Sequence, residues 1–151
     1  MKSPLVKADA EARALRTYVK LMRAADSFTS RAHRHLEEFG LTFSQFAVLD
    51  ALYHLGPLHL KDLAKKILRS SGNLTMVVDN LEKCGLVLRK QEASDRRFFS
   101  VYLTAKGRST FERVFPRHVQ ILVAEMSLLT DEEQDELGRL CRKLGRSTEE
   151  A

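Results

Sequence analysis

Apolar residues recur every three or four positions along the first quarter of the chain, from Asp9 to about Glu38. These positions are Ala12, Leu15, Val19, Met22, Ala25, Phe28, Ala32, Leu36 and Phe39. The spacing predicts one amphipathic helix of roughly 30 residues that ends at Gly40. Such a long apolar stripe needs a large covering surface, and a chain of 151 residues has little to spare. We therefore expect a second copy of the chain to cover it.

Shorter helices follow, each with a recognisable start or end. Thr42-Phe-Ser-Gln45 is a capping box that begins one helix, and Gly56-Pro57 ends it. A short helix from Leu60 to Ile67 comes next, then a turn at Leu68-Arg69. The following helix runs from Ser71 to Lys83, and its expected buried side consists of Leu74, Val77, Val78 and Leu81.

Two segments rich in β-branched and aromatic residues then predict a β-hairpin. Its strands span Val87–Gln91 and Phe98–Leu103, and its tip is Glu92-Ala-Ser-Asp-Arg-Arg97. Thr104 caps a further helix, which Pro116 should kink. Thr130-Asp-Glu-Glu133 is a second capping box, and the last helix ends at Gly145. The order of elements predicts a mainly α fold with a small β-hairpin wing, of α+β class.

Positive charge is concentrated on the helix-turn-helix and the hairpin. The segment Lys61–Arg108 holds 11 Lys/Arg and five Asp/Glu, a net charge of +6, whereas the rest of the chain carries −1. Such an excess is typical of a surface that binds a polyanion. A solvated basic face would show the same charge clustering, so the predicted shape of the segment favours the first interpretation.

Several short motifs in a fixed order carry a resemblance to a known family. They are Leu41-Thr-Phe-Ser-Gln-Phe-Ala-Val-Leu49, Asp62-Leu-Ala64, Asn73-Leu-Thr75, Leu81-Glu-Lys-Cys-Gly-Leu-Val87, Asp95-Arg-Arg97 and Leu103-Thr-Ala-Lys-Gly107. Together they resemble the MarR family of winged-helix transcription regulators over about residues 9–145. The resemblance implies a homodimer in which the first and last helices of two chains interlock. We expect one such domain over residues 1–151, with a winged helix-turn-helix lobe at about 41–104 and dimerisation helices at about 9–39 and 105–145.

The residues expected to contact DNA lie on the second helix of the motif and at the hairpin tip. Short hydroxyl and amide side chains at a helix N-terminus can reach phosphates and base edges. An arginine at the wing tip suits the narrow minor groove, and in the family an Asp two residues earlier braces it. The predicted set is Arg69, Ser70, Ser71, Gly72, Asn73, Thr75, Met76, Asn80, Lys83, Asp95, Arg96 and Arg97. Phosphate contacts are also expected from Lys65, Lys66, Arg89 and Lys90.

The resemblance further implies an effector pocket between the two regions. It would draw on Tyr18, Met22, Phe28, Phe46 and Phe111, although for any one of them a plain core position is the stronger interpretation. The predicted function is therefore a sequence-specific DNA-binding regulator that reads a pseudo-palindromic double-stranded operator. We expect a repressor whose DNA affinity a small-molecule effector lowers. A winged-helix module that binds a protein instead of DNA is the alternative.

Other chemistries have less support in the sequence. No Gly-rich phosphate loop, Gly-x-Ser-x-Gly or His-Glu-x-x-His motif occurs, so no enzyme activity, cofactor or catalytic residue is predicted. Cys84 and Cys141 are expected to be buried, inert thiols, which disfavours redox sensing. His33 and His35 should point to different helix faces and His118 is alone in its helix, which disfavours metal sensing.

Cellular location follows from composition as an expectation. Two cysteines are too few for a disulfide framework, and no apolar run approaches the ~20 residues of a membrane span. We expect a cytoplasmic protein with no membrane partner.

Overall fold

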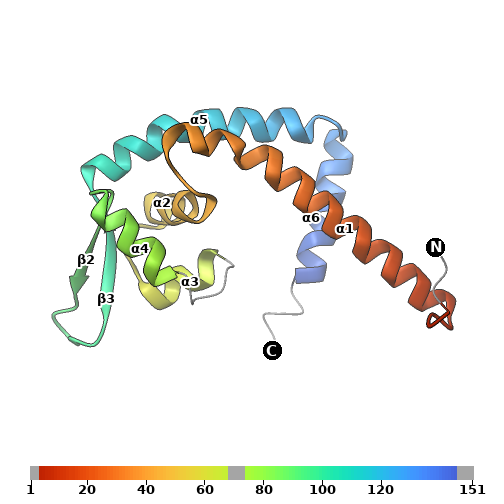
Figure 1. Cartoon of the computed structure of the whole chain (residues 1–151), viewed down its shortest axis with the longest axis horizontal. Helices are drawn as coiled ribbons and strands as arrows, with labels where there is room; N and C mark the ends of the chain where they lie inside the picture. The colour runs from red at the N-terminus through yellow and green to blue at the C-terminus, as the bar shows by residue number, and fades with distance from the viewer. Residues whose placement is uncertain (1–3, 68–73, 146–151) are drawn as a thin grey trace. The chain divides into compact units, whose positions relative to one another are not determined.

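The computed structural model describes residues 4–67 and 74–145 of the chain (Figure 1). The chain folds as two compact units. His33–His118 form one unit, which we call the winged unit. Met1–Ala32 and Val119–Ala151 form the other, the helical unit. None of the helices in the described residues has the length and apolar character that a bilayer crossing needs.

The first long helix is shorter than the sequence predicts. Helix α1 spans Asp9–His33, and a 3-10 helix, η1, continues as Arg34–Phe39. The prediction of one α-helix to about Glu38 is therefore wrong in its last turns. The tighter 3-10 winding brings the consecutive residues His35 and Leu36 both into the core. Gly40 then ends the helix as predicted, in the left-handed conformation at φ 67°.

The predicted capping box begins helix α2, which spans Phe43–Leu55. The Gln45 N–H donates to the Thr42 hydroxyl at 3.1 Å, and the Thr42 N–H donates to the Gln45 side chain at 2.9 Å. Leu41 and Phe46, on either side of the cap, are both buried in the core. This cap starts α2 directly after the chain reverses at Gly40.

Helices α3 (Leu60–Ile67) and α4 (Leu74–Lys83) form the two arms of the helix-turn-helix. The bounds of α3 are those predicted, whereas the predicted turn at Leu68-Arg69 and the start of the second helix lie outside the described residues. Leu74, Val78 and Leu81 of α4 are buried as predicted. These three residues fix which side of α4 faces away from the core.

The hairpin belongs to a three-stranded antiparallel sheet. Strands β2 (Val87–Gln91) and β3 (Phe99–Leu103) pair as predicted, and a third strand, β1 (Leu58–His59), pairs with β3. The order is β1-β3-β2, so β3 is central. Strand β1 was not predicted, because its two residues after a proline are too few to show a periodic pattern.

The core of the winged unit is continuous from η1 to the first half of α5 (Ala105–Met126). Its fully buried large side chains include Phe111, Leu49, Leu63 and Leu81. The ring of Phe111 lies 5.5 Å from that of Phe46 and 5.0 Å from that of Phe115, centroid to centroid. Pro116 lies inside α5, and its predicted kink stays a prediction.

The start of α5 packs directly on the chain segment between α4 and β2. The Thr104 hydroxyl accepts from the Gly107 N–H at 2.9 Å and donates to the Gly85 carbonyl at 2.7 Å. The Thr104 N–H donates to the Leu86 carbonyl at 3.1 Å. A Cβ atom on Gly107 would lie 2.0 Å from that same carbonyl oxygen. Position 107 therefore has room for glycine alone.

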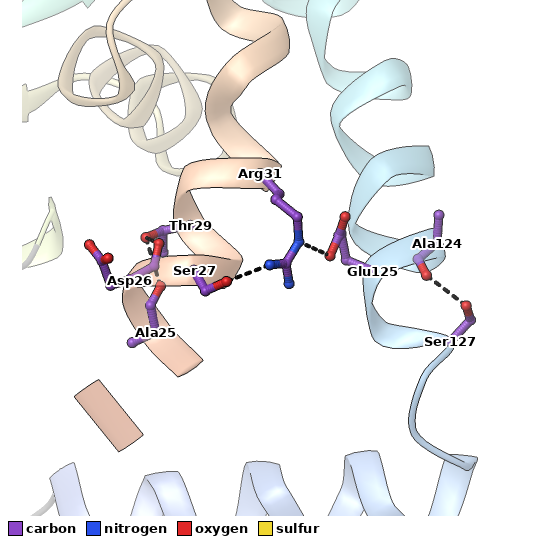
Figure 2. Close-up of polar contacts among 8 residues, drawn as sticks. All are labelled: Ala25, Asp26, Ser27, Thr29, Arg31, Ala124, Glu125 and Ser127. Atoms are coloured by element: carbon purple, nitrogen blue, oxygen red, sulfur yellow. Dashed lines mark hydrogen bonds and ion pairs between the residues drawn. The ribbon is translucent and has the colours of Figure 1, made fainter. Parts of the chain in front are cut away.

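The helical unit contains α1 up to Ala32, the end of α5 and helix α6 (Asp131–Gly145). Thr130 and Glu133 form the second predicted capping box, at 2.9 and 3.2 Å. Arg31 of α1 bonds Glu125 of α5 at 2.7 Å and Ser27 at 2.5 Å (Figure 2). Among the described residues, α1 buries Ala32 and α6 buries none.

Both cysteines are exposed, which corrects the prediction that they are buried thiols. Cys141 lies on α6, and this helix has no buried face in the single chain. Cys84 lies in the turn after α4, where its carbonyl accepts from the Lys106 ammonium at 2.9 Å. Each thiol lies near apolar residues in the sequence. In the single chain these residues do not cover it, so both thiols face solvent.

We expect Gly107→Ala to lower the free energy of unfolding by about 1–3 kcal/mol, because the new methyl group must displace the Leu86 carbonyl. Urea unfolding followed by circular dichroism measures the change. Gly138→Ala is the matched control: its Cβ would meet nothing within 4 Å in α6, so it should be neutral or stabilising by up to ~1 kcal/mol. Equal stability of Gly107→Ala and the unchanged protein would contradict the tight packing at this junction.

Candidate nucleic-acid interface

The exposed side of α4 carries the side chains that the sequence assigned to DNA. Thr75, Met76, Asn80 and Lys83 are all exposed, opposite the buried residues of the same helix. Met76 keeps 63% of its surface exposed. Arg69, Ser70, Ser71, Gly72 and Asn73 lie outside the described residues.

At the hairpin tip, Asp95 holds Arg97 through three contacts. The Asp95 carboxylate accepts from the Arg97 backbone N–H at 3.0 Å, from Nε at 3.1 Å and from a terminal guanidinium nitrogen at 2.8 Å. The bonds from Arg97 lower the pKa of Asp95, so the carboxylate stays charged. The expected Asp95–Arg97 pair is present, and 85% of the Arg97 side chain still faces solvent.

Further hydrogen bonds fix the shape of the tip itself. The Gln91 side chain donates to the Arg96 carbonyl at 2.5 Å, and the Phe98 N–H donates to the Asp95 carbonyl at 3.1 Å. The Glu92 N–H donates to the Phe98 carbonyl at 2.9 Å. The wing therefore presents Arg97 from a closed turn that has internal hydrogen bonds.

The basic residues predicted to hold phosphates divide into two groups. Lys65, Lys66 and Lys83 are exposed. Arg89 instead reaches back to α4, where it pairs with Asp79 at 2.6 Å and donates its N–H to Glu82 at 2.8 Å. Arg89 thus joins β2 to α4. This structural role was not predicted, because in the sequence Arg89 looks like any other basic residue that could bind phosphate.

A hollow of about 540 Å³ lies between α3, α4 and the hairpin. Its lining includes two lysines of α3, Lys61 and Lys65, together with Arg97 and the rings of Phe98 and Phe99. Lys61, Phe98 and Phe99 were not among the residues predicted for the site. Their position shows that the basic residues of α3 and of the wing border one continuous surface.

A helix-turn-helix backed by a hairpin with a solvent-facing arginine is the arrangement of winged-helix DNA-binding proteins. Residues 41–98 match the model described as the MarR family. The HTH-type transcriptional regulator YkoM of Bacillus subtilis is 35% identical over 133 residues, which are 88% of this chain and 86% of that relative. The chain belongs to the MarR family of transcriptional regulators, and it is a DNA-binding regulator.

Solved structures agree with this assignment. Sco3205, a MarR family regulator of Streptomyces coelicolor in complex with DNA, has a TM-score of 0.82 at 26% identity, covering 97% of this chain and 92% of that chain. BpsR of Bordetella bronchiseptica, whose DNA binding is regulated by 6-hydroxynicotinic acid, has a TM-score of 0.80 at 27% identity. The alignment covers 86% of this chain and 98% of BpsR. The predicted family and winged-helix fold are confirmed.

We expect Asp95→Ala to speed hydrogen exchange of the Arg97 backbone amide several-fold, because this N–H loses its carboxylate acceptor. Exchange followed by NMR measures the effect. Glu136→Ala removes a comparable carboxylate–arginine pair on α6, with Arg139, and should leave the Arg97 amide unchanged. If the Arg97 amide exchanges at the same rate with and without Asp95, the carboxylate does not brace the tip.

Proposed function

We propose that the chain is a homodimeric repressor that reads a pseudo-palindromic operator with one α4 from each copy. The observation that carries the proposal is that the exposed side of α4 and the braced Arg97 both belong to the basic surface of the winged unit. Two such helices would read half-sites about one helical turn apart. The sequence-specific part of the reading is assigned to Asn73, Thr75, Met76 and Asn80.

The roles within this surface follow from side-chain chemistry. Asn73 and Asn80 can form two-bond contacts with adenine, and the Met76 thioether can touch a thymine methyl group. Arg97 is proposed to enter the minor groove, with Arg96 beside it at the tip. Lys65, Lys66 and Lys83 would hold phosphates and so add affinity without sequence choice.

The homodimer is supported by apolar side chains that the single chain leaves uncovered. On α1 these are Leu15, Tyr18, Val19, Leu21 and Met22, and on α6 they are Leu137, Leu140 and Leu144, each with 36–63% of its surface exposed. Exposed apolar residues repeated along two helices are typical of a protein–protein interface. A second copy of the chain presents the same two helices and can bury them reciprocally.

An effector cavity is proposed inside the winged unit. A cavity of about 460 Å³ lies among α2, α3 and α5, and its lining combines aromatic and aliphatic side chains with Asp50, Lys66 and His118. Phe46 of the predicted effector set lines it, and Phe111 stacks on Phe46. Tyr18, Met22 and Phe28 belong to the helical unit and stay predictions. By analogy with BpsR, we propose that a small aromatic molecule in this cavity lowers DNA affinity.

We expect Arg97→Ala to weaken binding to a duplex from the protein's own upstream region by roughly 5- to 150-fold, because the guanidinium leaves the groove. Fluorescence anisotropy at fixed salt measures the affinity. Arg139→Ala, which removes another carboxylate-paired surface arginine and the same charge, should change it little. If both variants lose the same affinity, Arg97 contributes only its net charge. If Arg97→Ala leaves the affinity unchanged, Arg97 does not contact the DNA.

We expect the protein to be a dimer at micromolar concentration and Leu140→Glu to weaken the dimer at least tenfold. Each Leu side chain contributes about 1.5–3 kcal/mol when buried, and the two-fold interface loses it twice. Light scattering coupled to gel filtration measures the mass. Leu128→Glu, at an exposed position between α5 and α6, is the control and should leave the dimer intact. A monomeric unchanged protein would contradict the homodimer.

A further inference from the structure

Three histidines that the sequence analysis expected to lie apart gather at one end of the winged unit. The His118 ring of α5 lies 5.2 Å from the His35 ring of η1 and 6.2 Å from the His33 ring, centroid to centroid. His35 and His118 keep only 5% and 8% of their surface exposed. The ring of Phe46 lies 4.7 Å from that of His118. His35 and His118 are therefore buried rings packed among aromatic side chains, and the half-buried His33 lies beside them.

Buried ring nitrogens of His35 and His118 lack hydrogen-bond partners. Both nitrogens of His35 and Nδ1 of His118 are buried without one. A neutral imidazole carries one N–H donor and one acceptor, so either tautomer of His35 leaves both unmatched. The described residues contain no group of three or more His, Cys, Asp or Glu side chains placed to hold a metal ion. A nitrogen without a proton can accept one, so the two rings form a site for a single proton if they share it.

The surroundings of His118 oppose its charged form. Burial lowers the pKa of His118 below its ordinary value of 6.5, and His35 and His33 lower it further. Asp50 of α2 acts in the opposite direction, but it also pairs with His54 at 2.8 Å. Lys66 of α3 lines the same cavity as His118 and adds a further positive charge near it.

We propose that His35 and His118 form a proton switch that lowers DNA affinity when the pair takes up one proton. In the neutral pair the rings stack, with an interplanar angle of 29°. A protonated ring can donate its new N–H to a nitrogen of the other ring, but that bond needs the rings edge to edge. The proton therefore favours a packing different from the stacked one, and a second proton is opposed by repulsion between the rings.

The position of the pair links it to regulation. His33 and His118 are the terminal residues of the winged unit, so both chain connections to the helical unit begin at this cluster. Repacking of the rings would shift the ends of both connections. In the proposed dimer these connections join the unit that contains α4 to the helices that pair the two copies. This link to DNA rests on the proposed function, whereas the proton site does not. A ligand bound in the cavity lined by His118 would contact one of the two rings of this switch.

The sign of the pH dependence is opposite to that of simple charge. Because folding lowers the pKa of His118, the stacked packing is fully stable above 6.5 and loses stability as pH falls from 6.5 toward the lower folded-state value. A general gain of positive charge on acidification would instead favour binding to the DNA polyanion. A loss of affinity on acidification therefore identifies the buried pair.

Two measurements on the full-length protein test the switch. NMR titration of the His118 ring protons should give a midpoint below 6.5, the ordinary value for a histidine. Operator affinity should fall at least about fivefold between about pH 7.5 and about pH 5.5. His118→Phe keeps an aromatic ring and should abolish this fall, whereas His59→Gln, the control, should retain it.

Each result decides a separate step. A His118 midpoint at or above 6.5 overturns the proton site, and this titration needs no variant to fold. An affinity that stays constant or rises toward acid pH overturns the switch. The switch is also overturned if His118→Phe keeps the fall. If the protein binds no duplex at any pH, the proposed function is overturned. The His118 titration still tests the proton site in that case.

Discussion

The DNA-reading part of this protein depends on the close approach between the start of α5 and the Leu86 carbonyl. Thr104 bonds the Gly85 and Leu86 carbonyls, and Gly107 lets the helix backbone reach them. The end of α4, the end of β3 and the start of α5 therefore meet at one point. Backbone groups at this junction, together with the Thr104 hydroxyl, help to place the helix and the wing relative to each other. This packing explains in physical terms why Thr104 and Gly107 stand three positions apart in the Leu-Thr-x-x-Gly motif.

Local interactions made much of the fold predictable. The caps at Thr42 and Thr130 join residues three positions apart, so the sequence showed both partners together. Asp95 and Arg97 were predictable for the same reason. Strand β1 and the histidine cluster were not, because their partners lie about forty or more positions away along the chain. The exposure of Cys84 also depends on neighbours distant in sequence.

Two arginines of the hairpin show why charge alone does not assign a site. Arg89 is held by Asp79 and Glu82 of α4 and stabilises the contact between strand and helix. Arg97 is held by a carboxylate of its own turn, so the pair remains at the surface and the guanidinium faces solvent. The sequence presents both as basic residues of one hairpin. The carboxylate partners of Arg89 come from another element, whereas the partner of Arg97 lies in its own turn and leaves the guanidinium exposed.

The order of the small sheet affects how separate molecules meet. The central strand β3 is covered on one side by β1 and on the other by β2, so the longest open edge of the described sheet belongs to β2. Unpaired strand edges are sites where β-proteins aggregate, and charged side chains along them oppose this pairing. Arg89 and Lys90 lie in the middle of β2. The charges of these two residues oppose strand-to-strand pairing between the wings of separate molecules.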